Sequence, residues 1–440
     1  MDAISLTKDV RAATILKLAL TVFFVICLWL NYPLDADAHF VVSHLATVAL
    51  LALAPFLALS RSKITVRRPW GTKSDYLILA PLLLFLFLRM CQSIGNQFFF
   101  GQASKIILIL LGWLCFKSLD PDGKLFRFFA VVLTVVLAAG FAVGIMIWAI
   151  TGKIGEERLR ISPNDYEYVS EYAALMMPLI LFSLDELKEI KYKIMMFVVF
   201  VIVSSGLVLT GARGPLIGAI IVVLTYSYLA RKRVSITMWV SAMVTFVIIV
   251  IALGSIAYTT GSQTDTSRFS LGDHVSLDDP ASLEAFTSGR LSNWAYLTTE
   301  MLSNNTWIVF GSGLGQLAEW IPSDGGFYRP AITNGLLSSW VPFGLIGLFG
   351  YIYFNVYLWR RIRRIEPSAY RCMAISLFLA YIVTDQVETH WQGTNMLWYV
   401  SFILYILTLA RPALLPQTVT KAAPSPSRSR SMLKLSKSDA

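Results

Sequence analysis

The feature that most constrains this chain is a succession of long apolar segments separated by short loops. A helix needs about 20 mainly apolar residues to cross the hydrocarbon core of a bilayer, and the sequence contains about twelve segments of this kind. They lie near 13–32, 40–60, 76–92, 101–117, 128–151, 168–184, 194–211, 214–230, 236–257, 333–357, 370–386 and 394–410. The predicted fold class is therefore all-α, a polytopic membrane helix bundle with one large, partly helical outer loop.

The composition supports this interpretation and argues against nucleic-acid binding. Hydrophobic residues make up 56% of the chain and charged residues only 15%, whereas soluble proteins are about a quarter charged. The net charge of +10 would suit nucleic acid only if the basic residues gathered on one soluble face. They lie instead in short loops between apolar segments, so the expected surrounding is a lipid bilayer and no nucleic-acid partner is expected.

The cysteines and the N-terminus have simple interpretations. Four cysteines lie in or beside apolar segments without a Cys-x-x-Cys spacing, so neither disulfides nor a zinc site are expected. The first apolar segment could be a cleaved signal peptide, since Ala36-Asp37-Ala38 follows it. Trp29 and Tyr32 give it the interfacial aromatic pattern of a spanning helix, which we favour.

Loop charges predict the orientation of the bundle. The loops after the second, fourth, sixth, eighth and tenth predicted spans are rich in Lys and Arg, as is the tail. Basic loops stay in the cytoplasm, so we expect both termini there. The predicted organisation is nine spanning helices in 1–257, a non-cytoplasmic loop in 258–332, three spanning helices in 333–410, and a disordered basic cytoplasmic tail in 411–440.

The long outer loop contains a segment with helical periodicity. Leu291, Trp294, Leu297 and Met301 recur at the spacing of one helix face. The predicted amphipathic helix would lie on the membrane surface or pack against the protein's own helices, and the sequence does not separate these alternatives.

Arg213 is the principal candidate for anion binding. It lies in a turn between two apolar segments that is too short to be a solvated loop, and Pro215 suits the first turn of the following helix. A guanidinium beside a helix N-terminus would form an anion site. The alternative is an arginine that extends its charge to the lipid boundary.

Further outer-side arginines suit a phosphate or pyrophosphate ligand, because the guanidinium group binds such oxygens with two hydrogen bonds. Arg89 follows an apolar run, Arg290 precedes the amphipathic segment, and Arg158 and Arg160 lie in a short, densely charged loop.

Candidate bases lie on the same side. Glu171 falls within the sixth predicted span, and Asp385, Glu388 and His390 follow one another at the outer end of the eleventh. A polar cap at the membrane interface would explain these residues equally well. The sequence shows no outer-side pattern typical of a metal site, so no metal or cofactor is expected. The glycine run 311–315 predicts a tight turn rather than a nucleotide-binding loop.

Several ordered motifs resemble the O-antigen ligase/polymerase superfamily. Thr210-Gly211-Ala212-Arg213-Gly214 is similar to the family's "TGSRG" signature, Gly289-Arg290 with Trp294 to its "GR…W" segment, and Phe310 to Gly315 to its "GxGxG" turn. Thr333-Asn334-Gly335-Leu336-Leu337 through Gly344 to Gly347 resembles the "HN-x-L…G-x-x-G" helix, and Asn164 before Tyr172 and Ala173 resembles its "PN…A" entry.

The resemblance implies a metal-independent, membrane-embedded glycosyltransferase of the GT-C type in the bacterial inner membrane. Its donor would be a glycan on undecaprenyl pyrophosphate, reached from the periplasmic face, and its acceptor a polysaccharide. Arg213, Arg158, Arg160, Arg290 and Arg89 would bind the donor pyrophosphate. Other polysaccharide-export proteins are further candidate partners.

The resemblance favours a polymerase of O-antigen or exopolysaccharide repeat units (Wzy-type), with an O-antigen ligase as the alternative. In the ligases a histidine of the "HN" motif is thought to activate the acceptor, but here that position is Thr333, which cannot be a base at neutral pH. The base is therefore open among Glu171, Glu388, Asp385 and His390. From another class, a polytopic transporter or flippase remains an alternative.

Overall fold

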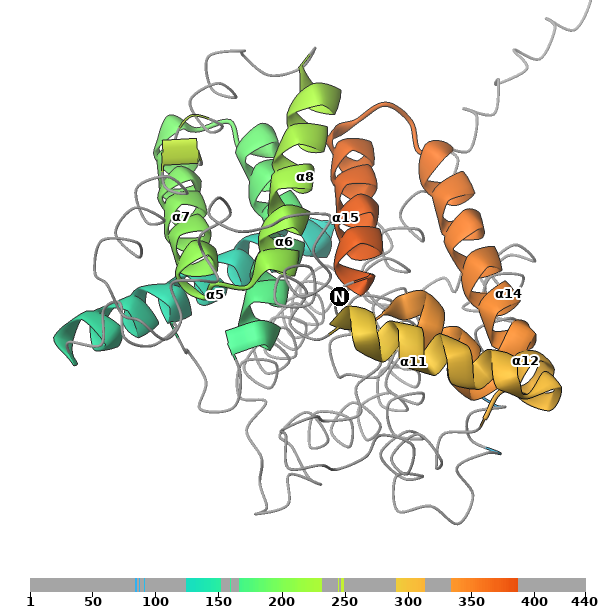
Figure 1. The fold of residues 1–440 in the computed structure, drawn as a ribbon. Coiled ribbons are helices and arrows are strands. Elements are labelled where there is room, and N and C mark those ends of the chain that lie inside the picture. The colour runs from blue at the N-terminus through green and yellow to red at the C-terminus, as the bar shows by residue number, and fades with distance from the viewer. Residues whose placement is uncertain are drawn as a thin grey trace, which may run out of the picture.

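The computed structural model of the 440-residue chain describes residues 124–151, 166–231, 290–312 and 334–386, with Leu159 and a few helical positions within 84–91 and 244–248. Every secondary-structure element in this part of the chain is a helix (Figure 1). The helices are α5 (Lys124–Ile150), α6 (Tyr166–Glu186), α7 (Ile190–Leu209), α8 (Arg213–Ala230), α11 (Arg290–Ser303), α12 (Asn305–Phe310), α14 (Gly335–Arg363) and α15 (Ala369–Asp385).

Six predicted spans fall on described helices, which confirms their helical character. Helices α5, α6, α7, α8, α14 and α15 cover the spans predicted near 128–151, 168–184, 194–211, 214–230, 333–357 and 370–386. The other six spans, the basic tail and most of the predicted outer loop lie outside or mostly outside the described residues.

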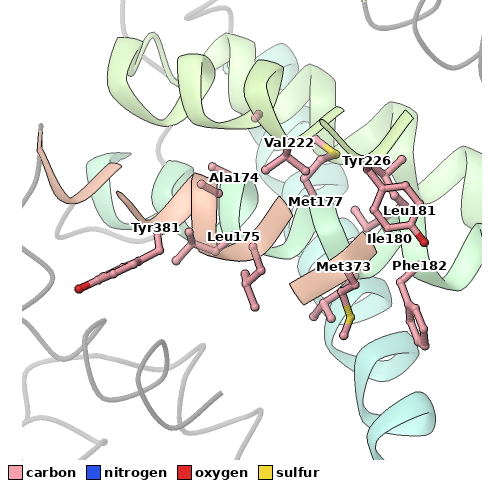
Figure 2. Packing of buried hydrophobic residues seen from close by; sticks show 14 of the residues in the cluster. Ala174, Leu175, Met177, Ile180, Leu181, Phe182, Val222, Tyr226, Met373 and Tyr381 are labelled. Carbon is pink, nitrogen blue, oxygen red and sulfur yellow. The ribbon is translucent and has the colours of Figure 1, made fainter. Parts of the chain in front are cut away.

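The helices α6, α7, α8, α15 and the longer part of α14 stand side by side; α6, α8 and α14 run in one direction, and α7 and α15 run in the other (Figure 1). Helix α15 packs most extensively against α8, and both pack against α6. The apolar core extends from these three helices to α5, α7 and α14. Between the three, Met177 and Ile180 of α6 meet Val222 of α8 and Met373 of α15 (Figure 2).

Small residues allow the helices to approach closely. A Cβ built on Gly218 of α8 would lie 2.8 Å from Thr384 Cγ2 of α15 and 3.9 Å from Ala174 Cβ of α6. Close backbone approach at small residues is how membrane helices associate, since lipid provides no hydrophobic driving force between them.

One end of the bundle is basic. The turns that join α6 to α7 and α14 to α15 lie at this end, as the ring contact of Phe182 with Tyr370 (4.9 Å between centroids) shows. We call it the basic end, and it carries Lys188, Lys191, Lys193, Arg231, Arg360, Arg361, Arg363, Arg364 and Arg371. Several of these arginines belong to the last turn of α14 rather than to a loop as predicted, because cations are favoured at a helix C-terminus.

Among the helices that the structure describes, α7 and α14 are long and apolar enough to cross a membrane. Their outward faces are apolar as well as their packed faces: Ile190, Ile194 and Val198 of α7 are at least half exposed. A helix that is hydrophobic all round suits a lipid surrounding rather than water.

At the end opposite the basic end, α11, α12 and the first part of α14 lie crosswise to the upright helices (Figure 1). We call these three segments the outer layer. Leu297 and Met301 of α11 are fully buried against Val341 of α14. The predicted amphipathic helix is therefore present, and these two residues pack against the protein itself.

Helix α14 is broken, which the prediction of one continuous span did not anticipate. Gly344 has φ 61° and ψ −155°, two residues after Pro342. Proline and a glycine with positive φ both interrupt helices. The first part, 335–343, therefore turns into the outer layer, while the remainder continues to the basic end.

Backbone contacts at glycine lock this break in place. Gly311, with φ 80°, follows α12, and a Cβ here would overlap the backbone of Pro342 and Phe343. A Cβ on Gly344 would overlap the carbonyl of Val309 in return. Ser312 N donates to the carbonyl of Val341 at 2.9 Å, so the interrupted helix regains a partner for one carbonyl.

Candidate functional site

The turn between α7 and α8 places the backbone of Arg213 at the first position of a helix. Helix α7 ends at Leu209, Gly211 turns the chain with φ 64°, and α8 begins at Arg213 after the extended Ala212. Gly214 and Pro215 are buried in its first turn. The predicted short turn and helix start are confirmed, so the free N–H groups of α8 lie beside the Arg213 backbone.

Leu159, from the second predicted arginine segment, contacts the end of α7. Leu159 is fully buried, and its N–H donates to the carbonyl of Leu209 at 3.2 Å. Arg158 and Arg160 flank Leu159 in the chain, and Arg213 follows Leu209 by four residues. Two segments that are 50 residues apart in sequence are therefore joined next to the N-terminus of α8.

Glu171 lies at the same end of the bundle. It is 3% exposed and belongs to the second turn of α6, three residues before Ala174. Ala174 approaches Gly218, which is one turn beyond Gly214 on α8. Because one helical turn rises about 5 Å, Glu171 and the start of α8 occupy neighbouring levels of two packed helices.

Helix α15 contributes a buried carboxylate to the same end of the bundle. Asp385 is 0% exposed and ends the helix directly after Thr384, which contacts Gly218. Its Oδ2 accepts a hydrogen bond from Tyr351 Oη of α14 at 2.5 Å. Buried carboxylates are costly unless hydrogen-bonded and are usually retained for function.

Asn334 and Gly335 join α14 to this carboxylate. Asn334 caps α14, with Oδ1 accepting from Leu337 N at 3.1 Å, and its Nδ2 donates to Gln386 O and Oε1, both at 3.3 Å. Gln386 Nε2 in turn donates to Tyr351 Oη at 3.3 Å. Gly335 lies against Asp385 so closely that a Cβ would overlap the carboxylate.

The structure therefore brings together several of the predicted site residues from four helices. Glu171, Gly211, the backbone of Arg213, Gly214, Asn334 and Asp385 all lie at the end opposite the basic end. Arg290 begins α11 in the outer layer, where it is partly buried. Arg89, Arg158, Arg160, Thr333, Glu388 and His390 lie outside the described residues, as does the side chain of Arg213.

Sequence reasoning did not identify Tyr351, because a tyrosine within a predicted span is ordinary. Its signal is a hydroxyl at membrane depth, four residues before Asn355, on a helix otherwise rich in apolar residues. Within the described ranges, no group of three His, Cys, Asp or Glu side chains could hold a metal ion.

Comparisons with known proteins add no further identity. No model of a known protein family matches the chain, and no curated protein sequence matches it either. The assignment of a function therefore depends on the chemistry of this site and on the ordered motifs.

Proposed function

We propose that the chain is a polytopic membrane glycosyltransferase that polymerises repeat units of a surface polysaccharide, an O-antigen or exopolysaccharide. Its donor would be a growing glycan on undecaprenyl pyrophosphate, and its acceptor a second lipid-linked unit. The site would face the periplasm, with the basic end in the cytoplasm of a bacterium, because basic residues remain on the cytoplasmic side.

One observation carries this proposal: Leu159, which lies between Arg158 and Arg160 in the sequence, is hydrogen-bonded to Leu209 at the end of α7, directly before the turn that begins α8 at Arg213. A helix N-terminus with several guanidinium groups suits a pyrophosphate. Undecaprenyl pyrophosphate is already a good leaving group, so catalysis needs its developing negative charge stabilised rather than a general acid.

The buried carboxylates on α6 and α15 complement this cationic side. Acceptor attack on the anomeric carbon passes through an oxocarbenium-like transition state, which a nearby carboxylate stabilises. Glu171 and Asp385 are 3% and 0% exposed, so water is excluded around them. Exclusion of water favours transfer to a sugar over hydrolysis.

The broken helix α14 and the buried carboxylates favour a transporter or flippase as the second candidate, since such helices often form substrate sites in transporters. The break at Gly344 is filled by contacts with Gly311 and Ser312. In a transporter we would expect freed backbone groups to bind substrate or ion, so we favour the transferase. An O-antigen ligase would use the same donor site with lipid A–core as acceptor.

The two ends of α8 provide a matched test in the native host. Arg213→Ala should abolish polymerisation, leaving single-repeat glycans by gel, whereas Arg231→Ala, at the exposed C-terminal end of the same helix, should leave long chains unchanged. Accumulation of full-length glycan on the lipid carrier would instead indicate a ligase. Unchanged glycans in Arg213→Ala would contradict both transferase assignments.

The proposed orientation has its own test. In a variant that lacks the native cysteines, a membrane-impermeant thiol reagent added from the periplasmic side should label Leu302→Cys, which is 58% exposed in the outer layer. It should not label Lys191→Cys at the basic end, whose side chain is 67% exposed. The reverse pattern would overturn the orientation.

A further inference from the structure

The carboxylate of Asp385 lies against the first residue of α14. Thr333 occupies the place of the family's histidine, and Gly335 follows two residues later at the start of α14. A Cβ on Gly335 would overlap Asp385 Oδ2 and lie 2.9 Å from Tyr351 Oη. A glycine is therefore required at this point for the carboxylate of α15 to reach the start of α14.

A chain of hydrogen bonds fixes this carboxylate. Tyr351 Oη donates to Asp385 Oδ2 at 2.5 Å, Gln386 Nε2 donates to Tyr351 Oη at 3.3 Å, and Asn334 Nδ2 donates to Gln386 Oε1 at 3.3 Å. Hydrogen bonds to a charged acceptor are the strong ones. A group supported in this way keeps one geometry, which is what a reacting group requires.

We propose that Asp385 is the base of the transfer reaction and that Tyr351 is the positioning residue that holds it, an inference that rests on the proposed glycosyltransferase function. The acceptor hydroxyl transfers its proton to Asp385 while its oxygen bonds to the anomeric carbon of the donor glycan. The bond from that carbon to the pyrophosphate oxygen breaks, and undecaprenyl pyrophosphate leaves with the electron pair. The aspartic acid releases its proton to water after the products have left and solvent has entered the site.

The bundle contains a second tyrosine–aspartate pair that serves as a control. At the basic end, Tyr226 Oη of α8 donates to Asp185 Oδ2 of α6 at 3.3 Å. Tyr226 is fully buried, as Tyr351 nearly is. Removal of the same atoms from this pair also deletes a tyrosine–aspartate hydrogen bond but should leave the reaction unchanged.

The experiment uses the full chain, purified into lipid nanodiscs, with undecaprenyl-pyrophosphate-linked repeat unit as substrate. It compares Asp385→Asn and Tyr351→Phe with Asp185→Asn and Tyr226→Phe. The measurements are kcat and KM for glycan transfer, together with the thermal stabilisation that undecaprenyl pyrophosphate produces. This stabilisation reports an intact donor site independently of turnover.

We expect Asp385→Asn to lower kcat at least about 100-fold, the usual contribution of a general base, with stabilisation by undecaprenyl pyrophosphate unchanged. Tyr351→Phe should lower kcat about tenfold at constant KM, which corresponds to one hydrogen bond to a charged group. Asp185→Asn and Tyr226→Phe should stay within about twofold of the wild type.

The outcomes separate the inference from the proposed function. An Asp385→Asn variant that binds undecaprenyl pyrophosphate and keeps its kcat would overturn the inference alone, as would equal losses in both aspartate variants. If Asp385→Asn does not fold, Tyr351→Phe decides, since an unchanged kcat there contradicts the positioning role. A wild-type protein that binds the carrier but transfers no glycan would overturn the proposed function itself.

Discussion

The helix bundle contains a tyrosine–aspartate pair at each end, and the two pairs differ in their surroundings. Asp185 is partly exposed, lies 3.3 Å from Tyr226 Oη, and has Lys188 three residues away in the chain. Asp385 is fully buried and lies 2.5 Å from Tyr351 Oη. The same two residue types therefore form a partly solvated hydrogen bond at one end of the bundle and hold a buried carboxylate in place at the other end.

The difference follows from what covers each end. At the basic end, the helix ends carry exposed lysines and arginines. Their ion pairs contribute little to stability: Lys191 and Glu189 are 3.0 Å apart but more than 60% exposed, and such a pair contributes below about 1 kcal/mol. At the other end, the start of α14 covers Asp385. We propose that charge at the basic end sets the orientation in the membrane and that the buried carboxylate at the other end serves the reaction.

Gly335→Ala should have the largest effect, because it acts directly on the buried carboxylate of Asp385. The added methyl group overlaps Asp385 Oδ2, so the carboxylate must move. Displacement of a reacting group by about 1 Å costs about 100-fold in rate, which we expect in the transfer assay. Gly350→Ala, on the same helix with nothing within 4 Å of the new atom, is the control and should keep full activity; equal activity in both variants would argue against the site.

Gly344→Ala should have the next largest effect, through stability. Alanine at φ 61° is strained, and its methyl group would overlap the backbone of Val309. We expect a loss of about 2–4 kcal/mol, seen as a lower midpoint of thermal unfolding in detergent. Gly350→Ala should be neutral or slightly stabilising, because alanine favours helix. An unchanged midpoint for Gly344→Ala would show that the outer layer does not depend on this interlock.

The smallest expected effect distinguishes two asparagine caps. Asn304 caps α12 through Thr306 N at 3.0 Å, whereas Asn334 caps α14 and also binds Gln386. Asn304→Ala should cost about 1 kcal/mol, and Asn334→Ala about 1 kcal/mol more, both measured by thermal unfolding. Equal losses would mean that the contact between Asn334 and Gln386 adds nothing to the outer-end site.

Much of the helical layout could be predicted, because hydrophobic runs and loop charges act locally. The helix start at Arg213 followed from its short turn and Pro215, and α11 followed from its apolar spacing. The break at Gly344 could not be predicted, since it depends on Gly311 and Val309, which lie more than 30 residues earlier. Local propensity contains no information about such a contact.

The candidate site was only partly predictable for the same reason. Arg213, Glu171 and Asp385 stand out as charges within or beside apolar segments, where charge is costly. The hydrogen bonds of Tyr351 and Gln386 require α14 and α15 to meet in one register. With Thr333 in the place of the histidine, the sequence left the base open among Glu171, Glu388, Asp385 and His390, and our proposal of Asp385 depends on these hydrogen bonds.

The most direct test of the central claim is transfer by the purified protein in proteoliposomes. Undecaprenyl-pyrophosphate-linked repeat unit would be supplied with a chelator of divalent metals, and the products would be separated by gel. The account predicts a ladder of glycans longer than the starting unit, formed without metal. Recovery of only the starting unit, with the protein folded and bound to the carrier, would contradict it.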